Sequence, residues 1–207
     1  MTGQLITLEG GEGVGKTTNL AFIERYFDDR GIPLLKTREP GGTPLGENIR
    51  ELLLQGDAMD LKAELLLVFA ARAQHVAAVI RPALSVGTWV LSDRFTDASY
   101  AYQGGGRGLS LEMIETLERW VQDMLQPDLT LLLDLPVETG MARAKDRGRP
   151  DRFESEQLDF FERVRAAYVG RAKAYPQRFR RIDASQALET VQAQIKSHLD
   201  AFLERQG

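Results

Sequence analysis

The sequence predicts an α/β fold in which a five-stranded parallel sheet is flanked by helices. Short runs with the apolar and β-branched content of buried strands alternate with stretches that repeat at helical period. The strand-like runs lie at residues 4–9, 33–37, 88–93, 128–135 and 180–183. Because alternating strands and helices build a parallel sheet covered on both faces, ligands are expected at the carboxyl ends of these strands.

The first predicted strand runs directly into the sequence EGGEGVGKTT, residues 9–18. This loop completes the pattern G-x-x-x-x-G-K-[ST] with Gly10, Gly15, Lys16 and Thr17. The next residues, TNLAFIERYF, repeat at helical period, so strand, loop and helix follow in the order of a P-loop NTPase. Loop amides would hold phosphates at the positive end of the helix, Lys16 would reach the terminal phosphates, and the Thr17 hydroxyl can ligate Mg²⁺. The alternative is a glycine-rich turn that matches by chance.

Glu12 places a negative charge in the middle of this loop, where negative ligands would sit. At ~6 Å and an effective dielectric near 20, a carboxylate and one phosphate charge repel by about 3 kcal/mol. A loop that held only phosphate would gain by losing this carboxylate. Either Glu12 serves another ligand, or it points to solvent and is screened there. The loop alone leaves both readings open.

Composition limits the classes of function. The chain has 207 residues, of which 43% are hydrophobic and 27% charged, and this is typical of one globular domain, residues 1–207. A net charge of -4 argues against a general nucleic-acid or membrane partner, because such binding needs a basic surface. With no cysteine there is no disulfide framework and no thiolate metal site, which fits a reducing compartment.

Targeting signals are not expected. The N-terminus enters the phosphate loop without a preceding basic segment and apolar stretch, and no later apolar run is expected to approach the ~20 residues of a membrane span. We therefore expect a cytoplasmic protein.

Polar residues follow the other predicted strands. The second strand leads into TREPGGTPLGE, where Arg38 and Glu39 precede a Pro-Gly-Gly turn. The third ends in SDRF, so Asp93 can orient Mg²⁺-bound water and Arg94 can grip a phosphate bidentately. The fourth ends at Asp134, which suits an indirect Mg²⁺ partner. Each of these residues alone is more often a surface ion-pair member, but together at the strand ends they indicate a site.

Helical segments complete the pattern. Ser110 is expected to cap the helix LEMIETLERWVQDML, and the last helix is expected near LETVQAQIKSHLDAFLERQ. The segment RAKDRGRPDR sets five basic residues against Asp146 and Asp151, and the basic ones are Arg143, Lys145, Arg147, Arg149 and Arg152. A solvated charge run is the usual interpretation. A glycine and a proline interrupt the helix here, however, so a basic lid over residues of about 143–154 that closes on phosphates is the alternative.

Six segments together resemble the thymidylate kinases, in that family's order and over most of the chain. They are EGGEGVGKTT, TREPGGTPLGE, LVFAARAQHV, SDRF, AYQGGGRG and RGRPDRFE. The phosphate loop is shared by many unrelated enzymes, whereas REPGGT with DR and AYQGGGR is specific. The resemblance implies a nucleoside monophosphate kinase-like fold and transfer of the ATP γ-phosphoryl group to dTMP, giving dTDP and ADP in dTTP biosynthesis. It also implies an Mg²⁺-dependent homodimer.

In this family the acidic residue of the loop serves the acceptor nucleotide, which implies that Glu12 accepts a hydrogen bond from the deoxyribose 3′-OH. Some relatives place a catalytic arginine next to that acid, but here the neighbour is Gly13. The arginine-rich segment resembles the lid of the bacterial-type variant, which implies that Arg147 and Arg152 supply the missing charge. Arg149 has no match in the family pattern.

The resemblance also implies an acceptor pocket. Arg38 and Arg94 would hold the dTMP phosphate, Phe69 would stack on the thymine, and Arg72 would hydrogen-bond the edge of the base. Many relatives space that aromatic residue and arginine by four positions instead of three, and Phe69 is otherwise read as a core aromatic. The remaining candidates are Ser99 and Gln103 for base contacts, Tyr102 for crowding out a ribose 2′-OH, and Glu12. Solvent-facing polar groups and a packed tyrosine are the alternatives for these.

For ATP, the resemblance implies that Arg143 lies against the adenine and that Gln186 borders it. The phosphates would be held by Gly10, Gly11, Glu12, Gly13, Val14, Gly15, Lys16, Thr17 and Thr18. Mg²⁺ would be bound by Thr17 and, through water, by Asp93. The catalytic candidates are Lys16, Arg94, Arg147, Arg152 and Glu12.

Two other classes share the phosphate loop. A GTP-binding switch needs an N-K-x-D guanine signature, which does not occur in the sequence. An ATP-driven assembly or partition module would depend on a protein or DNA partner, and no segment is basic or apolar enough to indicate one. Among enzymes, the nearest rival is a kinase for another nucleotide.

Overall fold

The computed structural model describes residues 3–145, 152–153 and 156–205. Within these residues, five parallel strands form one sheet in the order β2-β3-β1-β4-β5. The strands are β1 Leu5–Glu9, β2 Leu34–Arg38, β3 Trp89–Asp93, β4 Leu129–Asp134 and β5 Phe179–Asp183. Each begins and ends within one residue of its predicted bounds, so the predicted α/β fold is confirmed.

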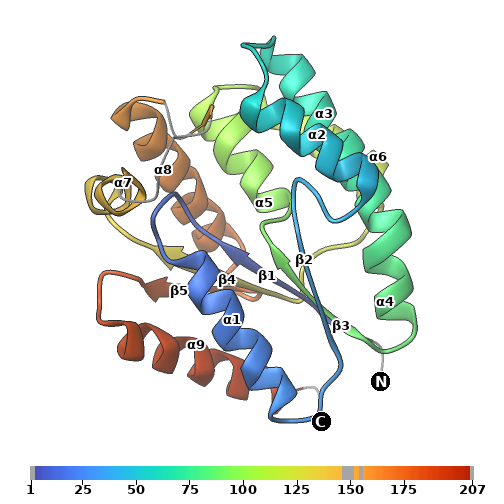
Figure 1. The fold of residues 1–207 in the computed structure, drawn as a ribbon, viewed down its shortest axis with the longest axis vertical. Coiled ribbons are helices and arrows are strands. Elements are labelled where there is room, and N and C mark those ends of the chain that lie inside the picture. The colour runs from blue at the N-terminus through green and yellow to red at the C-terminus, as the bar shows by residue number, and fades with distance from the viewer. Residues whose placement is uncertain (1–2, 146–151, 154–155, 206–207) are drawn as a thin grey trace.

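Helices connect the strands and cover both faces of the sheet (Figure 1). The α-helices are α1 Lys16–Asp28, α2 Pro44–Gln55, α3 Leu61–His75, α4 Arg81–Ser85, α5 Thr96–Ser99, α6 Leu111–Gln122, α7 Val137–Lys145, α8 Leu158–Ala174 and α9 Leu188–Leu203. Two π-helical segments, η1 Val76–Ile80 and η2 Tyr100–Gly106, continue α3 and α5 without a break.

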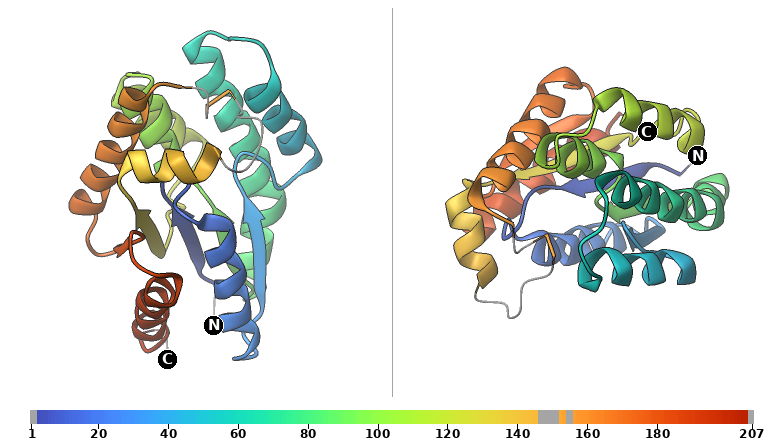
Figure 2. Two further views of the ribbon diagram at one scale, coloured as in Figure 1. Left: turned by 60° about the vertical axis from the view of Figure 1, so that its left-hand side comes forward. Right: turned by 90° about the horizontal axis from the view of Figure 1, so that it is seen from above.

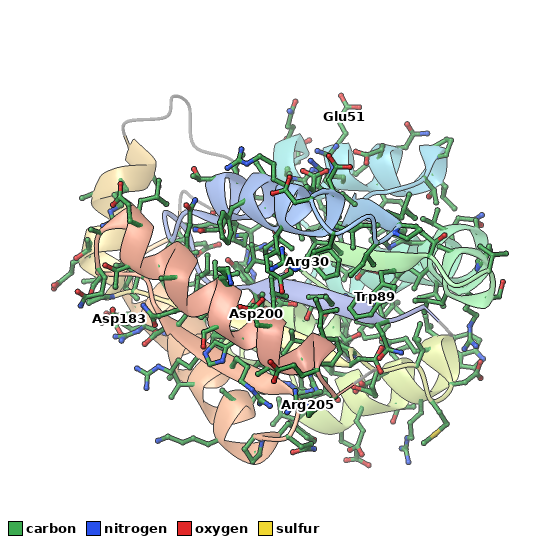
Figure 3. The ribbon with its side chains drawn as sticks, turned by 90° about the horizontal axis from the view of Figure 1, so that it is seen from below. Arg30, Glu51, Trp89, Asp183, Asp200 and Arg205 are labelled. Atoms are coloured by element: carbon green, nitrogen blue, oxygen red, sulfur yellow. The ribbon has the colours of Figure 1, made fainter. Side chains whose placement is uncertain are left out.

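Alternating side chains of the strands divide the core into two layers, because successive residues of a strand point to opposite faces. From β1, Ile6 and Leu8 pack in the cluster shared with α1 and α9, whereas Leu5 packs with η1 and α4. The two helices of the first layer are also joined at their surface, where Arg30 and Asp200 meet at 3.3 Å (Figure 3). Helices therefore pack against both faces of the central strand β1.

The segment Leu61–Ser85, which forms α3, η1 and α4, is by length and composition apolar enough to cross a membrane. The expectation that no apolar run approaches the length of a span is wrong for these 25 residues. The segment packs inside the fold: Val68 faces α2, Phe69 faces α6, and Ile80 packs with residues of β1 and β3. It also buries the charged Arg72 against a carboxylate. The faces that pack against these elements account for much of the apolar composition, whereas Leu66 of the same segment is 56% exposed.

The first six residues of the segment AYQGGGRG belong to the π-helix η2, a geometry that often occurs at functional sites. Its glycines allow close packing: a side chain on Gly106 would lie 2.4 Å from the ring of Phe160 on α8. Ser110 stands at the N-cap of α6 as predicted, but its side chain makes no capping hydrogen bond.

Candidate functional site

A cavity of about 240 Å³ opens at the carboxyl ends of β1, β2 and β3, as the fold predicts. Its lining comes from segments far apart in the sequence: the loop before α1, the turn after β2, helices α2 and α3, the end of β3, and η2. Among the predicted site residues, those that line it are Glu12, Gly13, Val14, Gly15, Lys16, Thr17, Arg38, Arg72, Asp93, Arg94, Ser99, Tyr102 and Gln103. The candidates for the phosphate loop and for the acceptor pocket thus share one cavity.

The phosphate loop depends on glycine at specific positions. Gly13 and Gly15 have φ values of 70° and 90°, in the left-handed region that favours glycine. A side chain at Gly13 would also lie 1.9 Å from the carbonyl oxygen of Gly140, because α7 lies beside this loop (Figure 2). The chain therefore has no room for an arginine next to Glu12. Within the loop, Lys16 Nζ donates to the Gly11 carbonyl at 3.3 Å.

Arg94 lies between the loop and η2. Its Nη1 donates to the Gly10 carbonyl at 2.6 Å, and its Nη2 donates to Glu12 Oε1 at 2.7 Å. Tyr102 donates its hydroxyl to the same Glu12 oxygen at 2.7 Å. Burial disfavours the charged form of Arg94. Neighbouring Tyr102 and Glu12 nevertheless raise the pKa of Arg94 well above its usual value. Glu12 therefore does not point freely to solvent, since its side chain is only 18% exposed and an arginine offsets its charge.

Two further arginines reach the same cavity. Arg38 holds Glu47 through Nη2 at 2.6 Å, and Arg50 Nη1 donates to the Pro40 carbonyl at 3.0 Å. Burial lowers the pKa of Arg50, and the charges of Arg38 and Arg94 lower it further. Three guanidinium groups that raise one another's electrostatic free energy are suited to bind an anion.

Arg50 is absent from the sequence-based candidates. The spacing of Thr43, Glu47 and Arg50, at positions i, i+4 and i+7 of α2, places them on one helix face, and Thr43 caps that helix by accepting from the Gly46 amide at 3.0 Å. The helical spacing within TREPGGTPLGENIR would therefore have identified Arg50 as a candidate site residue from the sequence.

At the far end of the cavity, Arg72 is buried and held by protein groups. Its Nε donates to Glu39 Oε2 at 2.7 Å, and its Nη2 donates to the Phe95 carbonyl at 3.3 Å. Its Nη1 is buried without a partner among the described residues. Buried polar atoms are normally hydrogen-bonded, so this nitrogen is suited to a ligand in the cavity.

Phe69 is not in the predicted place. It packs in the core with Leu65 and Ile114, and its ring lies behind Arg72, whose Cζ is 4.6 Å from the ring centroid. Val68, four residues before Arg72, lines the cavity instead. Residues spaced by four lie on one helix face and point the same way, which explains the difference. The structure thus corrects the stacking assignment of Phe69 and agrees with its reading as a core aromatic.

Two more atoms of this cavity are buried without a partner in the part of the chain that the structure describes: Asp93 Oδ1 and Ser99 Oγ. Magnesium bound with nucleotides takes one or two protein oxygens besides phosphates and water. The described residues contain no group of three or more His, Cys, Asp or Glu side chains that could hold a metal ion. The Thr17 hydroxyl and the Asp93 carboxylate, which line one cavity, fit the sparse protein coordination of Mg²⁺.

Asp134 does not fit the predicted indirect Mg²⁺ role. It is outside the cavity, and Arg165 Nε and Arg181 Nε donate to its carboxylate at 2.8 and 2.9 Å. Burial would raise the pKa of Asp134, but the hydrogen bonds from these two arginines lower it below its usual value. Its charge is therefore used in ion pairs at the end of β4.

The lid candidates are only partly described. Arg147 and Arg149 lie outside the described residues. Arg152 donates from Nη2 to Glu64 Oε2 at 2.7 Å and from Nε to the Leu53 carbonyl at 2.8 Å. These contacts hold Arg152 against α2 and α3 and not beside the phosphate loop.

The adenine candidates lie at another edge of the molecule. Arg143 on α7 donates from Nη1 to the Ala184 carbonyl at 3.4 Å, and Gln186 is two residues further along the same loop. Gln186 Nε2 donates to Asp183 Oδ2 at 2.9 Å. Both side chains are exposed, and Thr18 is exposed on α1. These three residues do not line the main cavity.

Glu9 ends β1 immediately before the phosphate loop and is fully buried. It accepts from the Phe95 amide and from the Tyr168 hydroxyl, both at 2.7 Å. Burial raises the pKa of Glu9 from 4.5 to about 8, and the charge of Asp97 contributes to this.

This shift predicts a pH-dependent stability. Between about pH 4.5 and 8 the folded chain keeps a proton on Glu9 that the unfolded chain releases, so its contribution to the free energy of unfolding falls as the pH rises through this range. Glu9→Gln cannot titrate and lacks this decline. Urea unfolding from pH 5 to 9 should show the wild type losing stability relative to the mutant by on the order of a few kcal/mol. A constant difference between the two proteins would contradict the assignment.

Comparison with known proteins gives a consistent result. A family model described as "Thymidylate kinase" matches residues 8–195. A protein named "Thymidylate kinase" from Pseudomonas putida (strain GB-1) is 59% identical over 207 residues, which cover 99% of each chain. One of the same name from Teredinibacter turnerae is 59% identical over 205 residues, with 98% of this chain and 100% of the other covered. The crystal structure of thymidylate kinase from Ehrlichia chaffeensis is similar with a TM-score of 0.79 and 32% identity, over 97% of this chain and 99% of that one.

Proposed function

The chain belongs to the thymidylate kinase family, and on this basis we propose how its cavity is divided between the two nucleotides. The reaction is the transfer of the ATP γ-phosphoryl group to dTMP, which gives dTDP and ADP for dTTP synthesis. The observation that carries the division is that the phosphate loop and the guanidinium cluster of Arg38, Arg50 and Arg94 line the same cavity. The donor phosphates occupy the loop, and the acceptor phosphate lies opposite.

On the donor side, the amides of Gly10–Thr18 hold the ATP phosphates and Lys16 contacts the terminal ones. Thr17 and, through water, Asp93 hold Mg²⁺, which neutralises charge on the phosphates. The unpartnered Asp93 Oδ1 supports this role. Arg143 and Gln186 border the adenine, because both meet the loop after β5.

On the acceptor side, Arg38, Arg50 and Arg94 hold the dTMP phosphate. Two phosphate groups must approach each other for transfer, and clustered guanidinium groups offset their repulsion. Arg94 also contacts the phosphate loop through Gly10, so it fixes the distance between acceptor and donor. The attacking oxygen belongs to the dTMP phosphate, and Arg94 aligns it with the γ-phosphorus.

The deoxyribose and the base define the rest of the pocket. Glu12 accepts from the 3′-OH, while Arg94 and Tyr102 hold its carboxylate in place. The Tyr102 ring occupies the space that a ribose 2′-OH would need. At the base, Arg72 Nη1 donates to a ring carbonyl, and Ser99 and Gln103 contact the same edge. Two of these atoms, Arg72 Nη1 and Ser99 Oγ, are buried without a protein partner in the described chain, which supports the assignment.

We further propose a cytoplasmic homodimer with a lid over residues of about 143–154, in which Arg147 supplies the catalytic charge. The dimer is supported by exposed apolar side chains on neighbouring helices: Leu66 of α3 is 56% exposed, and Met113 and Trp120 of α6 are 44% and 79% exposed. Met113 and Trp120 are seven residues apart and share a helix face. The net charge of -4 supports the absence of a nucleic-acid or membrane partner.

The proposal is tested at Glu12. Glu12→Gln should lower kcat/KM for dTMP by about 10- to 100-fold, because a hydrogen bond to a charged group is replaced by a neutral one. The affinity for ATP, measured by calorimetry, should change by less than severalfold. Tyr102→Phe removes the hydroxyl that donates to Glu12 Oε1. It should lower kcat/KM for dTMP less than Glu12→Gln does.

The matched substrate is 3′-deoxy-dTMP, which lacks the hydroxyl. Wild type should lose activity on it by a factor similar to that of the mutation, and Glu12→Gln should lose little more, because the two changes remove one interaction. If wild type and mutant lose activity on 3′-deoxy-dTMP by equal factors, the proposed contact between Glu12 and the 3′-OH is wrong.

A further inference from the structure

A buried carboxylate lies behind the cavity and takes no part in the roles given above. Glu64 of α3 has no exposed surface. Gln103 Nε2 donates to its Oε1 at 2.9 Å, Arg152 Nη2 donates to its Oε2 at 2.7 Å, and Arg107 Nη2 lies 3.4 Å from Oε2. The Glu64 side chain thus joins α3, the π-helix η2 and Arg152, which lies at the C-terminal end of the arginine-rich segment.

The contact with Glu64 determines which way the Gln103 amide points. A carboxylate paired with two guanidinium groups accepts hydrogen bonds and does not donate them. Only the nitrogen end of the Gln103 amide can therefore face Glu64. The oxygen end, Oε1, is left for the cavity that Gln103 lines, and none of the described residues donates to it.

Besides the Ser99 hydroxyl, which can donate or accept, the cavity then presents one group that only accepts and one that only donates. The acceptor is Gln103 Oε1, and the donor is Arg72 Nη1, which has no partner among the described residues. The edge of thymine offers the complement, an N3–H donor beside the O4 acceptor. Held in the same orientation, with N3 toward Gln103 and position 4 toward Arg72, cytosine offers the reverse, an N3 acceptor beside an amino donor, and would leave buried polar groups unpaired.

We propose that Glu64 is a positioning residue for base selection. It fixes the Gln103 amide with its oxygen toward the cavity, so that dTMP is accepted and dCMP is rejected. This inference rests on the proposed base contact of Gln103 and adds the residue that sets its direction.

The Glu64 carboxylate also anchors Arg152, the residue before Phe153 in the wall of the cavity. Arg152, besides its ion pair with Glu64, donates its backbone N–H to the Leu54 carbonyl at 3.0 Å. The next residue, Phe153, lines the cavity and packs edge-on against Tyr102, with ring centroids 5.8 Å apart. Glu64 therefore holds the base-reading side chain and the adjacent wall in one hydrogen-bonded group.

The test compares kcat/KM for dTMP with kcat/KM for dCMP in wild type and Glu64→Gln. A carboxamide can donate as well as accept, so it no longer forces the Gln103 amide into one orientation. The dTMP/dCMP ratio should fall by about tenfold or more, while the KM for ATP stays unchanged. Glu156→Gln is the matched control, because Glu156 pairs with Arg107 but not with Gln103 or Arg152. It should keep the ratio within about twofold.

Two further variants keep the test decisive. If Glu64→Gln does not fold, Glu64→Asp retains the charge but withdraws it from Gln103, and it should lower the ratio in the same direction. A ratio unchanged in a folded Glu64 variant overturns the inference. Gln103→Met distinguishes the base contact of Gln103 from the positioning role of Glu64. If Gln103→Met lowers the ratio while the Glu64 variants do not, Gln103 contacts the base but Glu64 does not position it. If Gln103→Met also keeps the wild-type ratio, the base contact itself is wrong.

Discussion

Arg94→Ala should lower kcat/KM for dTMP by ~10³-fold or more. The mutation removes the side chain that joins the phosphate loop to the acceptor site, because Arg94 donates to the Gly10 carbonyl and to Glu12 at 2.6 and 2.7 Å. It also removes the guanidinium group that donates to the Glu12 carboxylate, whose negative charge would then repel the two phosphate groups more strongly. Both effects act on the reacting atoms. Steady-state kinetics with dTMP as the varied substrate measures the loss.

Arg94→Lys separates charge from geometry. Lysine keeps the positive charge but cannot donate to Gly10 and Glu12 at once, so it should recover only part of the lost rate. Arg30→Ala, which breaks the exposed ion pair with Asp200 on the far face, should leave kcat/KM within about twofold. If Arg94→Ala retains activity within tenfold of wild type, Arg94 has a structural role and does not hold the dTMP phosphate.

Arg147→Ala should lower kcat by ~10³-fold while leaving dTMP affinity, measured by calorimetry, within severalfold. Charge gathers on the phosphoryl oxygens in the transition state, and position 13 cannot supply an arginine to stabilise it, because a side chain there would meet the Gly140 carbonyl. The proposed source of that charge is Arg147 of the arginine-rich segment. Ground-state binding should change less, since in the proposed arrangement Lys16 and the loop amides hold the phosphates.

The neighbouring arginines give the controls for this prediction. Arg152 is held by Glu64 at 2.7 Å, so Arg152→Ala should raise the KM for dTMP as well as lower kcat, which distinguishes an anchor from a transition-state contact. Arg149→Ala should be milder than either. A near-normal kcat for Arg147→Ala would reduce the segment to a solvated basic loop, and the catalytic charge would then lie at Arg94.

Local sequence patterns predicted the strands and the phosphate loop well. The bounds of the strands follow from runs of apolar residues, and the phosphate loop follows from glycines whose backbone angles other residues rarely adopt. The polar residues at the ends of β2 and β3 lie together because parallel strands share an edge. All of these are properties of short segments and of their order.

Residues whose role depends on tertiary contacts were harder to predict. Phe69 and Val68 are adjacent in the sequence, and only the rotation of α3 decides that Val68 faces the cavity. Asp134 has the position of a metal partner, but arginines from α8 and β5 occupy it. Glu64 lies within an apolar run, and its importance appears only when η2 and the segment around Arg152 meet it.

The most direct test of the account is incubation of the protein with Mg-ATP and a panel of nucleoside monophosphates, with diphosphate products measured by chromatography. We expect dTMP to give the highest kcat/KM. We expect dUMP to be slower by about 10- to 200-fold, because it lacks one methyl group. We also expect dCMP, purine nucleotides and the 2′-hydroxylated analogue of dTMP to be converted far more slowly. If another monophosphate is phosphorylated faster than dTMP, the assignment of this cavity as a thymidylate acceptor site is wrong.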